Sequence, residues 1–196
     1  MEITYDDYKL AIINAGEDKL MDLSYHWDRK LFNKDYNKQL INDKSINSRK
    51  LLAIMVIANS YLNTNLFVGL LKHPNVDASI AGYWINYGTL NGDIIRTKFY
   101  LSMIERHSDI VSDSFVNKAL KQHDTAILVA MLKNKIMADR LSDHKKLELL
   151  RTNSENSKFT DRIKGTAHLE DLFVKLYEQY HIDIYLPDSV KDIFLF

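Results

Sequence analysis

The chain of 196 residues has no cysteine, two prolines and six glycines. The absence of cysteine excludes disulfides, thiolate nucleophiles, iron–sulfur clusters and Cys-type zinc sites. Tight turns and phosphate-binding loops rely on glycine and proline, so this chain can form few of them. Because all-β and doubly wound α/β chains of this size use many turn-forming residues, the shortage predicts helices joined by polar loops.

The chain also lacks an excess of charge of either sign. Its 26 Lys and Arg residues balance 26 Asp and Glu residues, so a role that depends on strong overall charge is not favoured. The longest apolar run, Leu51 to Ala58, has eight residues, whereas a membrane-spanning helix needs roughly 20. The first ten residues carry no apolar run typical of a secretory signal. We therefore expect a cytoplasmic protein with no membrane partner.

The N-terminal part shows helical periodicity followed by a polar stretch. Apolar residues recur every three or four positions in Tyr5 to Ile13 and again in Leu20 to Leu31. These two segments predict amphipathic helices that form an N-terminal hairpin. The span Phe32 to Lys44 is rich in Asn, Lys and Asp, and we expect it to be a polar connection.

A more deeply apolar helix follows this connection. Leu51 to Tyr61 is hydrophobic on almost every face, which predicts a central position, and either Ser45 or Asn47 can cap its start. Strand-like alternation is best developed in His181 to Leu186, which we interpret as an extended tail because no partner strand is evident. The apolar C-terminus, Ile193 to Phe196, is expected to dock on this chain or on a second copy.

A search for internal similarity finds a repeat when Leu62, Gly92 and His123 are taken as origins, 30 and 31 residues apart. The residue after each origin can cap a new helix. The matching positions, from seven before to nine after each origin, are Met55, Ile85 and Val116, then Ala58, Gly88 and Ala119, then Asn63, Asp93 and Asp124, and finally Leu70–Leu71, Tyr100–Leu101 and Met131–Leu132. The middle copy carries Arg96 and Thr97 where the outer copies are apolar. The unit predicts a pair of antiparallel helices that buries its apolar face only against a neighbouring pair.

The unit resembles a diverged ankyrin repeat. The segment Leu66 to Asp77 is similar to the second helix and outgoing loop of that family, with Ile127 to Asp139 as a looser counterpart. The family's Thr-Pro-Leu-His opening is missing, and the period is shorter than the family's 33 residues. The resemblance covers Leu51 to Asp139, and a helical bundle without repeats stays open as the alternative.

From these features we expect an all-α fold of stacked antiparallel helix pairs, an ankyrin-like α-solenoid with helical caps at both ends. Residues 1–196 are predicted to form a single domain. Within it, residues 1–44 form the hairpin and connection, residues 45–140 the helix pairs, and residues 141–196 a helical cap and tail.

The resemblance implies a non-enzymatic protein-interaction module that needs no cofactor and no metal. The composition of the chain, in which lysines outnumber arginines, is typical of proteins from many bacteria and their viruses. We therefore expect an adaptor or inhibitor of bacterial or phage origin. In such a scaffold the partner binds along the loop tips and first helices. The corresponding residues here are Asn75, Asp77, Tyr83, Trp84, Tyr87, His107 and Asp109. Trp84 and Tyr87 can equally belong to the core, and their exposure decides between the two interpretations.

One alternative is a metal-dependent phosphohydrolase. The order His107, then His123-Asp124, then Asp139 or Asp143 resembles the ligand order of the HD phosphohydrolase family, in which a divalent metal activates water. A helix cap at Asp124 accounts for the same residues without a metal.

The other alternative is a helical repeat protein that binds nucleic acid. The segment from Lys133 to Lys164 is the most cationic part of the chain and could follow a phosphate backbone. Its basic residues are Lys133, Lys135, Arg140, Lys145, Lys146, Arg151, Lys158, Arg162 and Lys164. Acidic residues between them favour a solvated face of mixed charge instead.

Overall fold

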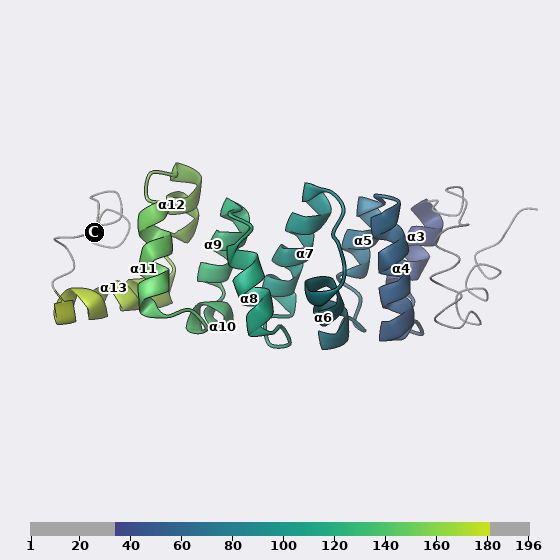
Figure 1. Cartoon of the computed structure of the whole chain (residues 1–196), viewed down its shortest axis with the longest axis horizontal. Coiled ribbons are helices and arrows are strands. Elements are labelled where there is room, and N and C mark those ends of the chain that lie inside the picture. The colour runs from purple at the N-terminus through teal and green to yellow at the C-terminus, as the bar shows by residue number, and fades with distance from the viewer. Residues whose placement is uncertain (1–33, 181–196) are drawn as a thin grey trace, which may run out of the picture. The chain divides into compact units, whose positions relative to one another are not determined.

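The computed structural model describes residues 34–180, and every regular element in this range is an α-helix (Figure 1). The helices are α3 (Lys34–Asn42), α4 (Ser48–Ser60), α5 (Thr64–Leu70), α6 (Ala78–Asn86), α7 (Asp93–Arg106), α8 (Asp113–Leu120), α9 (Thr125–Lys133), α10 (Lys135–Asp139), α11 (Asp143–Thr152), α12 (Ser157–Ile163) and α13 (Ala167–Tyr180). The prediction of an all-helical chain is confirmed for this range. The predicted N-terminal hairpin, the strand-like tail and the apolar C-terminus lie outside it.

The chain divides into two compact units, one ending at Ser102 and the other beginning at Met103. The division falls inside α7, which contributes most of its length to unit 1 and its last turn to unit 2.

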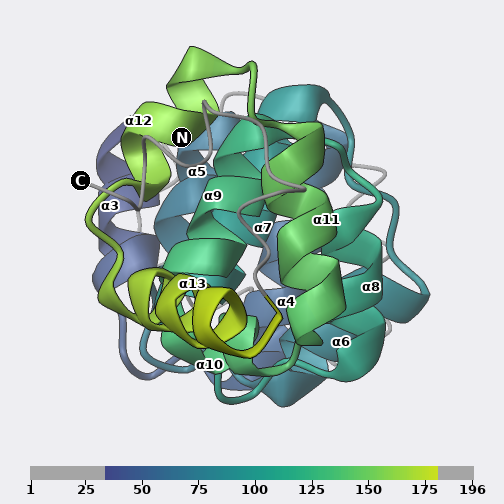
Figure 2. The ribbon, with the colours of Figure 1, turned by 90° about the vertical axis from the view of Figure 1, so that its left-hand side faces the viewer.

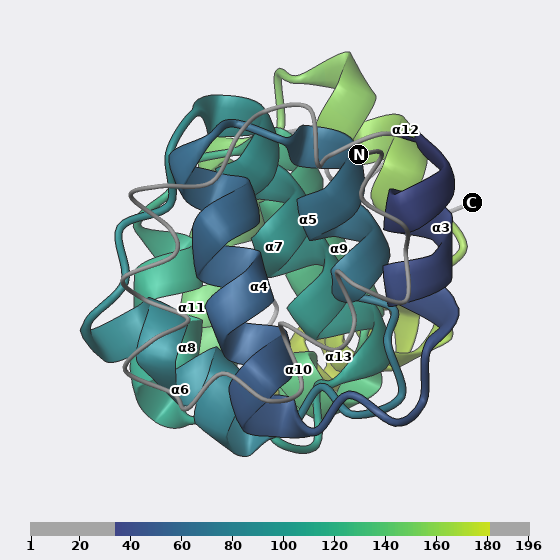
Figure 3. The same ribbon diagram turned by 90° about the vertical axis from the view of Figure 1, so that its right-hand side faces the viewer.

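The first helix of unit 1, α3, corrects the expectation of a polar connection between Phe32 and Lys44. This helix packs against α5 with its buried Leu40, and Figure 3 shows α4, α5 and α3 side by side in that order. The Ile41 side chain lies against the backbone of Gly69, where a Cβ atom would collide with it. A few apolar residues, Leu40 with the half-buried Tyr36 and Ile41, therefore dock a helix that is otherwise polar.

Within unit 1, α4 packs against both α5 and α6. The middle of α4 is buried on most faces, including Ile54, Met55 and Ala58, which confirms the central position predicted for it. Asn47, rather than Ser45, caps the helix, because its side chain accepts a hydrogen bond from the Lys50 amide at 3.0 Å. Ser45 instead donates to Asp43.

Unit 2 contains the last turn of α7 and helices α8 to α13. Figure 2 shows α8 and α11 on one side of this unit and α9 and α12 on the other, while α13 crosses below α9. Helix α9 packs against α8, α10 and α12. Its buried residues Ile127, Leu128, Met131 and Leu132 supply much of the apolar surface between these helices.

The three repeat origins are the points where the backbone turns from one helix into the next. Leu62, Gly92 and His123 have φ angles of 54°, 81° and 52°, in the left-handed region that residues other than glycine rarely adopt. Asn63 and Asp124 then cap α5 and α9 as predicted. The middle copy differs, because Asp93 lies inside the first turn of α7 and pairs there with Arg96.

A shift of one residue explains why the middle copy looks degraded. Ile95 and Phe99 are buried in α7 one position earlier than their counterparts in α5 and α9, and Tyr100, Met103 and Ile104 are buried as well. Arg96 and Thr97 are consequently only half-buried. An alignment that keeps the same spacing in all three copies therefore places Arg96 and Thr97 at positions that are apolar in the outer copies.

Asn156 caps α12 and follows Asp124, the cap of α9, by 32 residues. Only Phe159 and Ile163 are buried in α12, so its apolar pattern is too sparse to align from sequence.

The turn conformation predicts opposite effects for two glycine substitutions. Gly92→Ala should lower the free energy of unfolding by about 1 kcal/mol, because alanine is strained at positive φ. Gly82→Ala, inside α6 with open space around the new methyl group, should raise it by about 0.5–1 kcal/mol. Urea unfolding curves measure both. Equal shifts in the same direction would contradict the assigned backbone geometry.

Candidate functional site

The loop after α5 is held by its polar side chains against the loop that follows α3. The His73 Nε2 atom lies 3.0 Å from the Asp43 carbonyl oxygen, and the Asn75 amide donates to His73 Nδ1. Because an amide can only donate, Nδ1 is the acceptor and the ring donates its Nε2 proton to Asp43. Asn75 also donates to the Ile46 carbonyl at 2.6 Å. The predicted partner residue Asn75 is thus engaged in joining two loops.

Asp77, the next predicted partner residue, caps α6. Its carboxylate accepts hydrogen bonds from the Ser79 and Ile80 amides and from the Ser79 hydroxyl. Burial raises the pKa of Asp77, but these bonds and one from the Ser48 side chain outweigh it and leave the pKa below its usual value of 3.8. The ionised carboxylate of Asp77 is therefore the form that caps the N-terminus of α6.

Asn59 joins the first helix of one pair to the turn of the next, a role the sequence analysis missed. Its Nδ2 donates to the Thr89 carbonyl at 2.9 Å, and its Oδ1 accepts from the Asn91 amide at 2.8 Å. The side chain is 4% exposed. A lone amide in the otherwise apolar stretch of α4 was the available signal, because a buried amide needs partners.

The same kind of bond recurs in unit 2. Asn134 donates to the Ile104 carbonyl, Asn156 donates to the Thr125 hydroxyl, and His168 lies 2.6 Å from the Leu132 carbonyl. Together with those of unit 1, these bonds link residues 29 to 36 positions apart. Each bond therefore joins two segments that lie about 30 residues apart in the sequence.

Among the predicted aromatic residues, Trp84 belongs to the core. It is 4% exposed and meets Phe67 and Phe99 at centroid distances of 5.4 and 6.5 Å, both in edge-to-face geometry. Its indole nitrogen is buried without a hydrogen-bond partner. Gly88 approaches so closely that a Cβ atom there would collide with the Trp84 ring. The expectation of Trp84 as a contact residue is corrected by this burial.

Tyr87 has the opposite environment, with 83% of its surface exposed. Its ring lies 6.5 Å from the half-buried Tyr83, which in turn packs edge-on against Trp84 at 5.2 Å. Leu62 and Ile94 are also exposed, at 61% and 65%. All three stand at or beside the turns α4–α5 and α6–α7, and the Leu62 side chain reaches within van der Waals distance of a Cβ atom at Gly92.

The remaining predicted contact residues follow α7 in unit 2. His107 is half-buried and Asp109 is exposed in the loop before α8. Neither belongs to unit 1, which holds the other five predicted residues.

The residues of the phosphohydrolase alternative have other roles. Asp124 caps α9 by accepting from the Ala126 and Ile127 amides at 2.8 and 3.1 Å. Asp139 pairs with Lys135, and Asp143 pairs with Lys146 and Lys175. Within residues 34–180, no three histidine, aspartate or glutamate side chains are grouped so that they could hold one metal ion.

The cationic segment is partly neutralised by ion pairs. Lys135, Lys145 and Lys146 bind carboxylates at 2.7, 2.8 and 3.1 Å. Arg140 instead donates to the Val111 carbonyl. The basic residues are therefore not a uniform track along unit 2.

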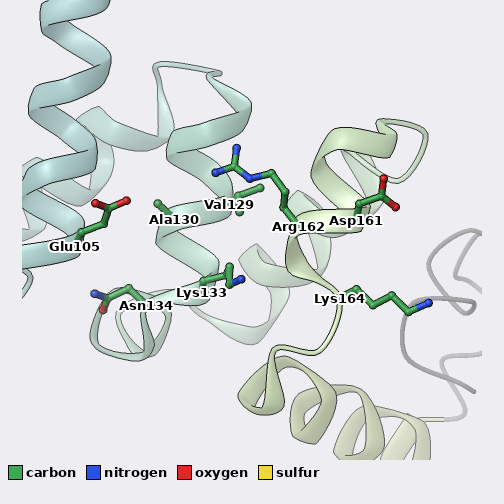
Figure 4. Close-up of a pocket in the computed structure, with 8 residues that line it drawn as sticks. All are labelled: Glu105, Val129, Ala130, Lys133, Asn134, Asp161, Arg162 and Lys164. Carbon is green, nitrogen blue, oxygen red and sulfur yellow. The ribbon is translucent and has the colours of Figure 1, made fainter.

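Three other cations of this segment line a hollow of about 580 Å³ in unit 2 (Figure 4). Its lining residues come from the end of α7, from α9 and from the region of α12, and are Glu105, Val129, Ala130, Lys133, Asn134, Asp161, Arg162 and Lys164. Figure 4 shows the Arg162 side chain extending from α12 toward α9, whereas Asp161 and Lys164 extend away from α9. Asp161 is one of the acidic residues of the cationic segment. Because its side chain extends away from α9, it compensates the positive charge of Lys133 and Arg162 less.

Comparison of the chain with protein-family models, with curated proteins and with solved structures finds no match. Across residues 34–180, none of the helices combines the length and the apolar character that crossing a membrane requires.

The cap at Asp77 predicts a dependence of stability on pH. Because folding lowers the pKa of this carboxyl, its contribution is complete above about pH 4 and is lost as the pH falls through the folded-state pKa. Asp77→Asn keeps an acceptor but cannot titrate, so its loss of stability between pH 6 and pH 3 should be smaller than that of the native protein. Asp109→Asn serves as the exposed control. Identical pH profiles for the native protein and Asp77→Asn, measured by urea unfolding, would refute the cap.

Proposed function

We propose that this protein is a non-enzymatic binding scaffold of ankyrin-like stacked helix pairs that recognises another protein. The hydrogen bonds between neighbouring pairs support this proposal, because a chain built from nearest-neighbour contacts presents the same edge of each pair to solvent. The helix-to-helix turns at Leu62, Gly92 and His123 recur with the spacing that such an array requires.

Tyr87 is the observation that carries the proposal. A tyrosine that leaves 83% of its surface in water gains nothing from burial within its own chain. Its neighbour Tyr83 is fixed against the core by Trp84, so the exposed ring stands on a rigid base. Tyrosines of this kind are common anchors of protein interfaces, because they bury a large area with few rotatable bonds.

The contact surface proposed here is the turn edge of unit 1, defined as Leu62, Tyr87 and Ile94. It differs from the loop tips that the ankyrin resemblance implies. Those tips contain Asn75 and Asp77, whose polar groups are already bound to the scaffold. The exposed apolar side chains of unit 1 gather instead where each first helix turns into the second.

Photocrosslinking from the turn edge tests this function. Replacement of Tyr87 by the photoreactive residue p-benzoylphenylalanine should give a discrete covalent adduct with one protein when cells expressing the chain in its natural setting are irradiated. The same residue at Lys121, exposed at the end of α8, is the matched control and should give no such adduct.

Loss of the adduct in a Leu62→Ser, Ile94→Ser background would identify the turn edge as the contact surface, provided circular dichroism shows that the helices remain. The proposal fails if position 87 yields no adduct, or if positions 87 and 121 yield the same products.

A further inference from the structure

The hollow in unit 2 contains positive charge that has no carboxylate partner among the described residues. Lys133 and Arg162 line it from α9 and α12, and neither forms an ion pair with any residue between 34 and 180. Four other lysines of the same unit are paired, as in Lys135 with Asp139. Lys133 and Arg162 thus line the hollow without a carboxylate bound to either of them among the described residues.

The walls of the hollow are held in place by the scaffold. Asn134 donates to the Ile104 carbonyl and accepts from the Met137 amide, so its side chain fixes the end of α7 against α10. Val129 is 1% exposed and gives the hollow an apolar wall. A site with fixed walls loses little conformational entropy when a ligand enters it.

The shape and charge of the hollow favour an isolated carboxylate. A guanidinium such as that of Arg162 can bind a carboxylate through two parallel hydrogen bonds, and a neighbouring lysine adds to the attraction. A nucleic-acid strand carries a charge on every nucleotide, so it would also bring phosphates against Glu105 and along the lysines that are already neutralised. A single acidic side chain also meets Glu105, but it does not extend along the neutralised lysines and so avoids the second cost.

We propose that this hollow binds a glutamate or aspartate side chain in an acidic segment of the protein partner, with Arg162 and Lys133 as its ligands. The inference rests on the proposed function, since it names the chemistry of the partner that the scaffold binds. It assigns unit 2 a contact of its own, separate from the turn edge of unit 1.

Fluorescence anisotropy of labelled short probes tests this proposal with the full chain at low salt. A peptide of alternating glutamate and serine should bind, whereas the same peptide with glutamine in place of glutamate should not. Lys133→Glu with Arg162→Glu should weaken binding of the acidic peptide about tenfold or more. Lys121→Glu with Arg151→Glu makes the same change in net charge away from the hollow and should leave binding within about twofold.

Three outcomes would overturn the proposal: no binding of the acidic peptide, equal weakening by both double variants, or tighter binding of labelled oligothymidylate that Lys133→Glu with Arg162→Glu abolishes. The last result would assign the hollow to nucleic acid. If the adduct at position 87 is still observed with any of these results, the proposed scaffold function is retained and only the proposed carboxylate site in the hollow is refuted.

Discussion

The two hydrogen bonds of Asn59 show how the helix pairs are joined. A turn between helices leaves main-chain groups without partners, and burying such a group unpaired costs about 1–3 kcal/mol. An amide side chain carries both a donor and an acceptor, so Asn59 satisfies the Thr89 carbonyl and the Asn91 amide together. Asn75 and Asn134 likewise donate hydrogen bonds to main-chain carbonyls, those of Ile46 and Ile104. These bonds join segments about 30 residues apart within residues 34–180.

This arrangement separates the polar groups that build the scaffold from the side chains that remain available. Asn75 and Asp77 turn inward to main-chain groups, and Trp84 completes the core. Tyr87 stands outside on the ring of Tyr83. Tyr87 therefore contributes little to the packing of the helices, and its replacement should leave them intact.

Periodicity predicted the helices from α4 to α9 and the turns between them, because burial of an apolar face leaves a repeating trace in sequence. Helix α3 was missed because its few apolar residues stand among Asn, Lys and Asp. The role of Asn59 could not be assigned either, because it depends on groups about 30 residues away. The cap at Asp77 is local, to Ser79 and Ile80, and its signal was present in the sequence. The contrast between Arg162 and Asp161, adjacent in sequence but differently directed, is likewise fixed only by the position of α12 beside α9.

Amide hydrogen exchange at Asn91 tests most directly whether neighbouring pairs are joined in this way. This amide lies in a turn, outside any helix, and its bond to Asn59 Oδ1 is the reason for it to be protected. The account predicts that Asn91 exchanges as slowly as amides inside α4 and that Asn59→Ala removes this protection. Exchange of Asn91 at the rate of an open loop in the native protein would contradict it.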